Sequence, residues 1–313
     1  MKFILALLCG AFSALAADVR VGIIGTDTSH VPAFAKLLNG DPAAADHVAG
    51  ARVVAAYKGG SKDIEESISR VDGFAEDIKS KYGVEIVADI PTLLSKVDVV
   101  LLTSVDGRVH LEQARPVIAA HKPLFIDKPL AATLEDAREI ARLAKAAGVP
   151  WFSSSSLRYG AIGAAMKLPG LTGAITWGPG PFEAHHPMEL AWYAIHPVEL
   201  LYTIMGTGCE SVTRIAGKDA DVIVGRWKDG RIGTVNAVRP YSDYGAIAFR
   251  GRETVESHPK TGAADYRPLV LEIVKFFQTG QPPAPNEETL EIFAFMDAAQ
   301  RSKEQGGKPV GLR

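Results

Sequence analysis

The sequence predicts two domains, a doubly wound parallel α/β domain followed by an α+β domain with an open, mainly antiparallel sheet. Two observations support this prediction. As far as residue 153, apolar strands alternate with helical segments, which is the pattern of a parallel sheet with helices on both faces. From residue 171, short β-rich runs follow one another instead. The length of 313 residues is sufficient for two cores of this kind.

The chain opens with a strand, a glycine turn and a helix. We expect the strand at 19–24, the turn at Gly25 and the start of the helix near Ser29. This order is typical of a dinucleotide-binding domain of Rossmann type, in which the helix N-terminus faces the pyrophosphate. Asp27 and His30 stand where the G-x-G-x-x-G fingerprint has its second and third glycines. A carboxylate at the second position repels phosphate, so the cofactor is indicated less clearly than the fold.

The first domain continues with the same alternation. We expect strands at 51–57, 84–87, 97–103, 122–126 and 149–153, and helices at 71–82, 90–95, 108–120 and 133–147. Thr133 is placed to cap the last of these helices, and Gly148 to end it.

The second domain contains five expected strands, at 173–177, 211–215, 221–227, 231–238 and 244–250. One helix, expected at 189–205, interrupts the series. Two closing helices are expected at 268–280 and 287–304. We therefore divide the chain into a signal segment (1–17), a Rossmann-type domain (18–152) and a substrate and oligomerisation domain (153–313). Its closing helices, within 268–304, are expected to pack back toward the first domain.

Residues 1–17 predict a secretory signal peptide, with a basic start, a short apolar run and small residues at Ala16 and Ala17 for cleavage. The run is short for a membrane span, so we expect a periplasmic or secreted protein with no membrane attachment after cleavage. No twin arginine precedes the run, so the chain is expected to cross unfolded and without a prebound cofactor. The net charge of −2 gives no basic bias toward nucleic acid.

Two later stretches complete a family pattern. Phe125-Ile-Asp127-Lys128-Pro129 is similar to an E-K-P motif with Asp in place of Glu, and the helix from Trp192 to Gly206 is similar to a D-x-x-x-H helix. Trp192 stands at the place of the aspartate, and His196 at the place of the histidine. Together with the opening unit, these stretches resemble the Gfo/Idh/MocA family, the glucose-fructose oxidoreductase and inositol dehydrogenase group. The resemblance extends over nearly the whole chain after the signal segment.

The resemblance implies NAD or NADP, a small-molecule carbohydrate substrate held between the domains, and a homo-oligomer (dimer or tetramer). It implies that Lys128 lies beside the nicotinamide and takes part in proton transfer, with His196 acting beside it. The chemistry agrees, because oxidation of a hydroxyl requires removal of its proton, and a Lys or His tuned by burial can accept it.

Dinucleotide contacts are expected at the glycine turn and at neighbouring strand ends. We assign them to Gly25, Thr26, Asp27, Thr28, Ser29, His30, Lys58, Ser61, Ser104 and Asp127. An NAD enzyme has an acidic residue after the second strand, whereas Lys58 and Ser61 suit a 2′-phosphate better. The alternatives are that this loop is a solvated turn and that Thr28 or Ser29 caps the helix.

Substrate contacts are expected from Arg158, His185, His186, Tyr193 and Glu199. The alternative for Arg158 is an interdomain ion pair, and for Tyr193 it is core packing. His196 and Glu199 share a helix face, so with the two adjacent histidines they are candidate ligands for zinc or another divalent metal. No H-E-x-x-H motif is present, and we favour substrate hydrogen bonding for this cluster.

Three functions are therefore open. The first is an exported oxidoreductase for a sugar, polyol or glycoside derivative, with Lys128 and His196 as the acid/base pair. The second is a dinucleotide-free carbohydrate lyase, epimerase or hydrolase on the same fold, with or without a metal. The third is a sugar-binding protein without turnover. Export and the altered glycine turn favour the second, whereas the intact lysine favours an enzyme over a binder.

Overall fold

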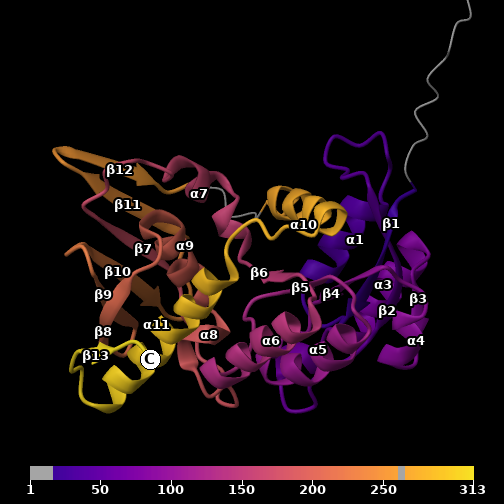
Figure 1. Ribbon diagram of the computed structural model, residues 1–313, viewed down its shortest axis with the longest axis horizontal. Coiled ribbons are helices and arrows are strands. Elements are labelled where there is room, and N and C mark those ends of the chain that lie inside the picture. Colours follow the sequence, from indigo (N-terminus) through magenta and orange to yellow (C-terminus); the bar gives the residue numbers. More distant parts are fainter. Residues whose placement is uncertain (1–16, 260–264) are drawn as a thin grey trace, which may run out of the picture.

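The computed structural model describes residues 17–259 and 265–313, so the expected signal peptide lies outside the described residues except for Ala17. Two domains lie side by side, each built on one sheet (Figure 1). In the part of the chain that is described, no helix combines the length and the apolar character that a membrane crossing requires.

The first sheet has six strands in the order β3-β2-β1-β4-β5-β6, all parallel. They are β1 (Val19–Ile24), β2 (Ala51–Tyr57), β3 (Glu85–Val87), β4 (Val99–Leu102), β5 (Leu124–Ile126) and β6 (Trp151–Ser153). The helices between them are α1 (His30–Asn39), α2 (Glu65–Ile68), α3 (Val71–Tyr82), α4 (Ile90–Leu94), α5 (His110–Ala119) and α6 (Leu134–Ala147). This confirms the predicted doubly wound sheet. The strand order reverses between β1 and β4, which is where ligands bind in such sheets.

The predicted ends of α6 are confirmed. The Thr133 hydroxyl accepts a hydrogen bond from the Asp136 N–H, and Gly148 closes the helix at a φ of 65°. The four-residue helix α2 was not predicted. It belongs to the segment between β2 and α3, which the sequence analysis had treated as a loop after the second strand.

The second sheet has the order β12-β11-β7-β10-β9-β8-β13. Its strands are β7 (Gly173–Pro179), β8 (Cys209–Ala216), β9 (Ala220–Trp227), β10 (Ile232–Val238), β11 (Gly245–Arg250), β12 (Glu253–Ser257) and β13 (Val310–Gly311). Only β7 and β10 pair in parallel, so the sheet is mainly antiparallel, as predicted. The edge strands β12 and β13 and the short helix α7 (Ala161–Ala165) were not predicted.

The single helix expected at 189–205 is wrong. It is divided into α8 (Glu189–Trp192) and α9 (Ile195–Met205), with Tyr193 outside helical geometry between them. Pro197 explains the break, because it has no N–H to donate to the carbonyl of Tyr193 and its ring would clash with that carbonyl. The break positions Tyr193 and His196 beside each other, with ring centroids 5.6 Å apart.

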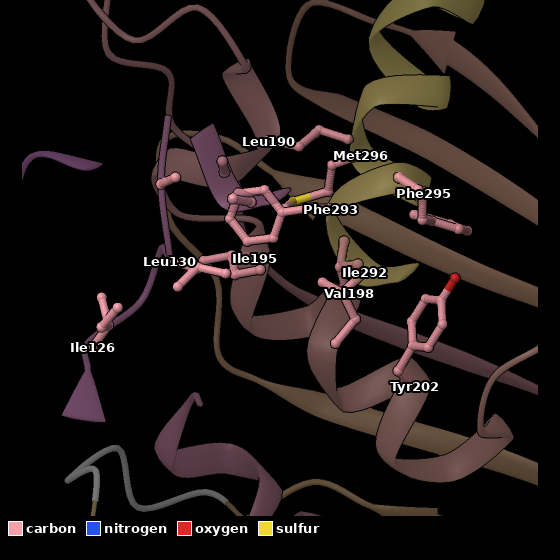
Figure 2. Packing of buried hydrophobic residues seen from close by; sticks show 14 of the residues in the cluster. Ile126, Leu130, Leu190, Ile195, Val198, Tyr202, Ile292, Phe293, Phe295 and Met296 are labelled. Carbon is pink, nitrogen blue, oxygen red and sulfur yellow. The ribbon is translucent and has the colours of Figure 1, made fainter. Parts of the chain in front are cut away.

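Two C-terminal helices join the domains. Helix α10 (Arg267–Thr279) packs on the first domain, where Phe276 lies 5.0 Å from the Phe152 ring of β6. Helix α11 (Asn286–Glu304) lies between the domains, and its Phe293 and Met296 point toward Leu130 (Figure 2). A continuous apolar core therefore connects the two sheets.

Candidate active site

One cavity of about 480 Å³ lies between the carboxyl ends of the first sheet and the second domain. Its polar wall includes His30 at the start of α1, Lys128 after β5 and His196 in α9. Five aromatic side chains also line the cavity: Trp192, Tyr193, Tyr241, Tyr244 and Tyr266. The cavity therefore combines nitrogen bases with flat apolar surfaces.

Lys128 reaches the cavity directly after the buried strand β5. Its Nζ lies 5.4 Å from the centroid of the Tyr193 ring. Burial lowers the pKa of Lys128 below its ordinary value of 10.5, although the neighbouring carboxylate of Asp127 opposes this shift. The neutral amine, which can accept a proton, is therefore more populated at a given pH than in a solvated lysine.

His30 and Asp127 form a buried pair beside Lys128. His30 Nδ1 lies 2.5 Å from Asp127 Oδ2, and the other carboxylate oxygen accepts the Lys128 N–H. Burial alone would raise the pKa of Asp127, but the charge and hydrogen bond of His30 lower it below its ordinary value. Tyr266 packs against the imidazole at 4.6 Å between centroids. Asp127 therefore fixes the orientation of the His30 ring.

His196 is held in place from the opposite side. Its Nδ1 lies 2.7 Å from the Ser155 hydroxyl, and its ring lies 5.7 Å from that of Tyr244. Burial lowers the pKa of His196 well below 6.5, with further lowering by the charges of Lys128 and His30. His196 is therefore neutral at physiological pH and can donate or accept a hydrogen bond.

Seven of the ten expected dinucleotide contacts do not line the cavity. Thr28, Ser29 and His30 do so; the others are Gly25, Thr26, Asp27, Lys58, Ser61, Ser104 and Asp127. Lys58 instead pairs with Asp72 at 2.7 Å. Gly25 packs so closely on Ser104 that a Cβ at Gly25 would lie 2.3 Å from the Ser104 nitrogen.

Residues 58–70, which we call the covering segment, pack on the glycine turn, where the phosphates of a dinucleotide lie in Rossmann domains. Ser67 of this segment donates a hydrogen bond to Asp27 Oδ2 at 2.6 Å, and the Val105 N–H donates to Oδ1 at 3.0 Å. Gly59 approaches the glycine turn so closely that a Cβ there would lie 3.3 Å from the Cα of Gly25.

The N-terminus of α1 offers no free donor in its first turn. The Val31 N–H donates to the Thr28 carbonyl at 3.1 Å, the His30 N–H lies 3.4 Å from the Thr28 hydroxyl, and Pro32 has no N–H. The Ser29 side chain makes no capping hydrogen bond, so of the two expected caps only Thr28 contacts a helix amide. The residues present do not fit the phosphates of a dinucleotide.

The expected substrate contacts are only partly brought together. Tyr193 lines the cavity, whereas Arg158 and Glu199 do not. Arg158 pairs with Glu199 at 2.8 Å and with Glu288 at 2.6 Å. Arg158 is therefore held in ion pairs, but with two residues of its own domain (153–313) and not across the two domains that its alternative named. Glu199 also accepts from the Ser154 hydroxyl and the Ser155 N–H, which leaves it no role at the cavity.

The histidine pair also lies outside the cavity. His185 is exposed and bonds Glu183 at 2.7 Å, while His186 is buried against the carbonyl of Met188. The four candidate metal ligands therefore have separate partners. Within residues 17–259 and 265–313, no group of three or more His, Cys, Asp or Glu residues could hold a metal ion.

Several lining residues were missed by the sequence analysis. They are Glu66, Arg70, Tyr241, Asp243, Tyr244, Asp265 and Tyr266. Tyr241 and Tyr244 frame a polar turn before a β-rich run, and this local cluster of aromatic residues is the signal that could have found them. The pairing of His30 with Asp127 had no sequence signal, because 97 positions separate the two residues.

Residues 19–154 match a family described as "Oxidoreductase family, NAD-binding Rossmann fold". The first domain of the chain therefore belongs to the Gfo/Idh/MocA family. Its Rossmann domain is thus that of an oxidoreductase family whose members bind NAD. No curated protein matches the chain in sequence.

Solved structures share the fold over most of the chain. Myo-inositol 2-dehydrogenase from Lactobacillus plantarum is similar with a TM-score of 0.76 and 17% identity, covering 95% of this chain and 100% of that one. Myo-inositol dehydrogenase from Lactobacillus casei, in complex with NAD(H) and myo-inositol, has a TM-score of 0.73 and 17% identity, with 95% and 97% covered.

Proposed function

We propose that the chain is a Gfo/Idh/MocA-type enzyme that binds a sugar, polyol or glycoside derivative in the cavity and transfers a proton there. The observation that carries the proposal is that Lys128, the neutral His196 and His30, which Asp127 holds from behind, line one cavity. A buried cavity with convergent polar groups and shifted pKa values is typical of an active site.

The walls support a carbohydrate. The C–H faces of a sugar or polyol pack on aromatic rings, and five aromatic side chains line this cavity. Its polar lining includes side chains of both charge types: the basic Lys128 and Arg70, and the acidic Glu66, Asp243 and Asp265. Such a set supplies donors and acceptors for several hydroxyl groups without selecting a strongly charged ligand.

Each base has a distinct role in the proposal. Lys128 accepts the proton, because its pKa is lowered and its neutral form is accessible. His30, oriented by Asp127, is a second proton carrier. His196, kept neutral and bonded to Ser155, holds a substrate oxygen in place.

Two types of reaction begin with transfer of a substrate proton to Lys128. Oxidation of a hydroxyl is favoured by the family match, since the family consists of oxidoreductases. A reaction without net oxidation, such as epimerisation, β-elimination or hydrolysis, is favoured by the covering segment, which fills the phosphate position.

The setting of the protein is part of the proposal. Residues 1–17 direct export to the periplasm or the exterior and are then removed.

The second sheet joins copies of the chain into a dimer or tetramer through the face that α9 and α11 leave uncovered. A row of half-buried side chains crosses that face, comprising Ile247, Ile175, Thr234, Val224 and Thr213. Light scattering coupled to size exclusion tests the assembly.

Binding of a panel of sugars and polyols, detected by saturation-transfer NMR, tests the function. We expect binding by the wild type, a weakened signal in Tyr266→Ala, and wild-type binding in Lys145→Met, whose residue is exposed on α6. For a substrate so identified, Lys128→Met should reduce turnover about 10²–10⁴-fold. No binding by any panel member, or wild-type turnover in Lys128→Met, would contradict the proposal.

A further inference from the structure

The covering segment carries an inference beyond the proposed function of the cavity, on which it rests. We infer that residues 58–70 replace the dinucleotide phosphates, that no dinucleotide binds at this edge, and that the cavity performs proton transfer on a carbohydrate without net oxidation.

The polar groups at the phosphate position have partners within the protein. Both oxygens of Asp27 accept hydrogen bonds, and the Thr26 hydroxyl donates to the Val71 carbonyl at 2.8 Å. The Ser61 N–H donates to the Ser67 hydroxyl at 2.8 Å. A phosphate entering here would break these bonds, and the first turn of α1 has no free N–H to offer in return.

Charge opposes a phosphate at the same place. Asp27 and Asp106 are each at most 1% exposed. Ser61 donates to Asp106 at 2.5 Å, and Arg108 contacts Asp106 at 2.8 Å and Asp63 at 2.7 Å. Both carboxylates would repel a phosphate, and Arg108 is already occupied by two acidic partners.

Packing holds the covering segment against residues of both domains. Ile64 is 1% exposed and packs with Val105 of the first domain and Trp192 of the second. The other side of the segment contributes Glu66 and Arg70, an ion pair, to the cavity wall. The segment therefore separates the glycine turn from the cavity, and its removal would expose the core beneath it.

The remaining groups support a proton-transfer reaction. Lys128, in its deprotonated amine form, takes a proton from a carbon adjacent to a substrate carbonyl, where the C–H bond is acidic enough. The electron pair of this bond moves to the carbonyl oxygen, giving an enolate. His30 returns a proton to the same carbon and is reprotonated from Lys128 through solvent. One C–H bond breaks and one forms, so no electron acceptor is consumed.

Dinucleotide binding is tested on the purified protein by calorimetry with NAD⁺ and with NADP⁺, together with hydrogen exchange at the Ser61 and Val105 amides. We expect no saturable heat at millimolar ligand, no nucleotide released on denaturation, and unchanged slow exchange at both amides. Ser67→Ala should accelerate exchange at the Ser61 amide, which shows that the probe reports on the segment. Saturable binding, or faster exchange when a dinucleotide is added, would overturn the closed phosphate position.

The reaction is tested by incubating keto-sugars and keto-polyols with the protein in D₂O and following the proton beside the carbonyl by NMR. We expect its exchange without any added cofactor, a loss of about 100-fold or more in Lys128→Met, and no loss in Lys145→Met. No exchange above the buffer rate, or wild-type exchange in Lys128→Met, would overturn the reaction. These readouts are separate from sugar and polyol binding, whose failure would overturn the proposed function instead.

Discussion

Ser67 donates a hydrogen bond to the carboxylate of Asp27 across 40 positions of the chain, and both residues are fully buried. Asp27 stands at the second glycine position of the dinucleotide fingerprint, and Ser67 belongs to a segment that was expected to be a loop. Their contact converts a candidate phosphate site into part of the protein core. Its energetic consequences can be measured without knowledge of the substrate.

Ser67→Ala should destabilise the protein by about 2 kcal/mol. It removes a donor to the buried Asp27 carboxylate and the acceptor of the Ser61 N–H, so both groups lose a partner. Urea unfolding measures the change. Ser80→Ala is the matched control, because Ser80 is exposed and bonds only carbonyls of its own helix; an equal loss in both variants would contradict the prediction.

Asp27→Asn should become more stable relative to the wild type as the pH rises. Burial raises the pKa of Asp27 above 3.8, so its stabilising contribution is present at low pH and is lost as the pH rises through the folded-state value. Asp89 provides the opposite case. Its pKa is lowered by hydrogen bonds from Thr92, so stability relative to Asp89→Asn should be lost as the pH falls. If the free energies of unfolding of the two variants, each relative to the wild type, changed with pH in the same direction, this assignment would be contradicted.

Lys128→Met should gain stability over the wild type as the pH falls from above 10.5 toward neutrality. The folded-state pKa of Lys128 lies below 10.5, so the wild type loses stability through the interval between the two values. The same variant should lose activity, since the buried amine is retained for proton transfer rather than for stability. Thermal unfolding at several pH values measures the effect, and Lys145→Met should show no such dependence.

Arg158→Ala should lower the free energy of unfolding by about 3–5 kcal/mol, because it leaves the buried carboxylate of Glu199 and the partly buried one of Glu288 without their cation. Arg142→Ala removes an exposed pair with Glu139 and should change stability little. Equilibrium unfolding monitored by tryptophan fluorescence measures both. A wild-type unfolding midpoint for Arg158→Ala would contradict the prediction.

Most of the fold could be predicted from local patterns. The strand before Gly25, the cap at Thr133 and the turn at Gly148 are each specified by neighbours in the sequence, and each is present. The helix expected at 189–205 was wrong because the effect of Pro197 on the Tyr193 carbonyl was not weighed against the apolar pattern. That error also concealed how Tyr193 comes to face His196.

The site could be predicted only in part. Lys128 and His196 were placed by motif, and they do share a cavity. Arg158 and Glu199 were expected to face a ligand but bind each other, because a buried charge is costly unless it is paired. Ionisable residue types alone do not distinguish a charge that binds substrate from one that forms an ion pair inside a domain.

By itself the sequence determined the two sheets, their order along the chain and the lysine at the end of β5, because hydrophobic periodicity and turn residues act over short distances. Only the tertiary structure decided which polar groups meet: His30 with Asp127, Ser67 with Asp27, and Arg158 with Glu199. These pairs join residues 40 to 97 positions apart, and each is fixed by the need of a buried polar group for a partner.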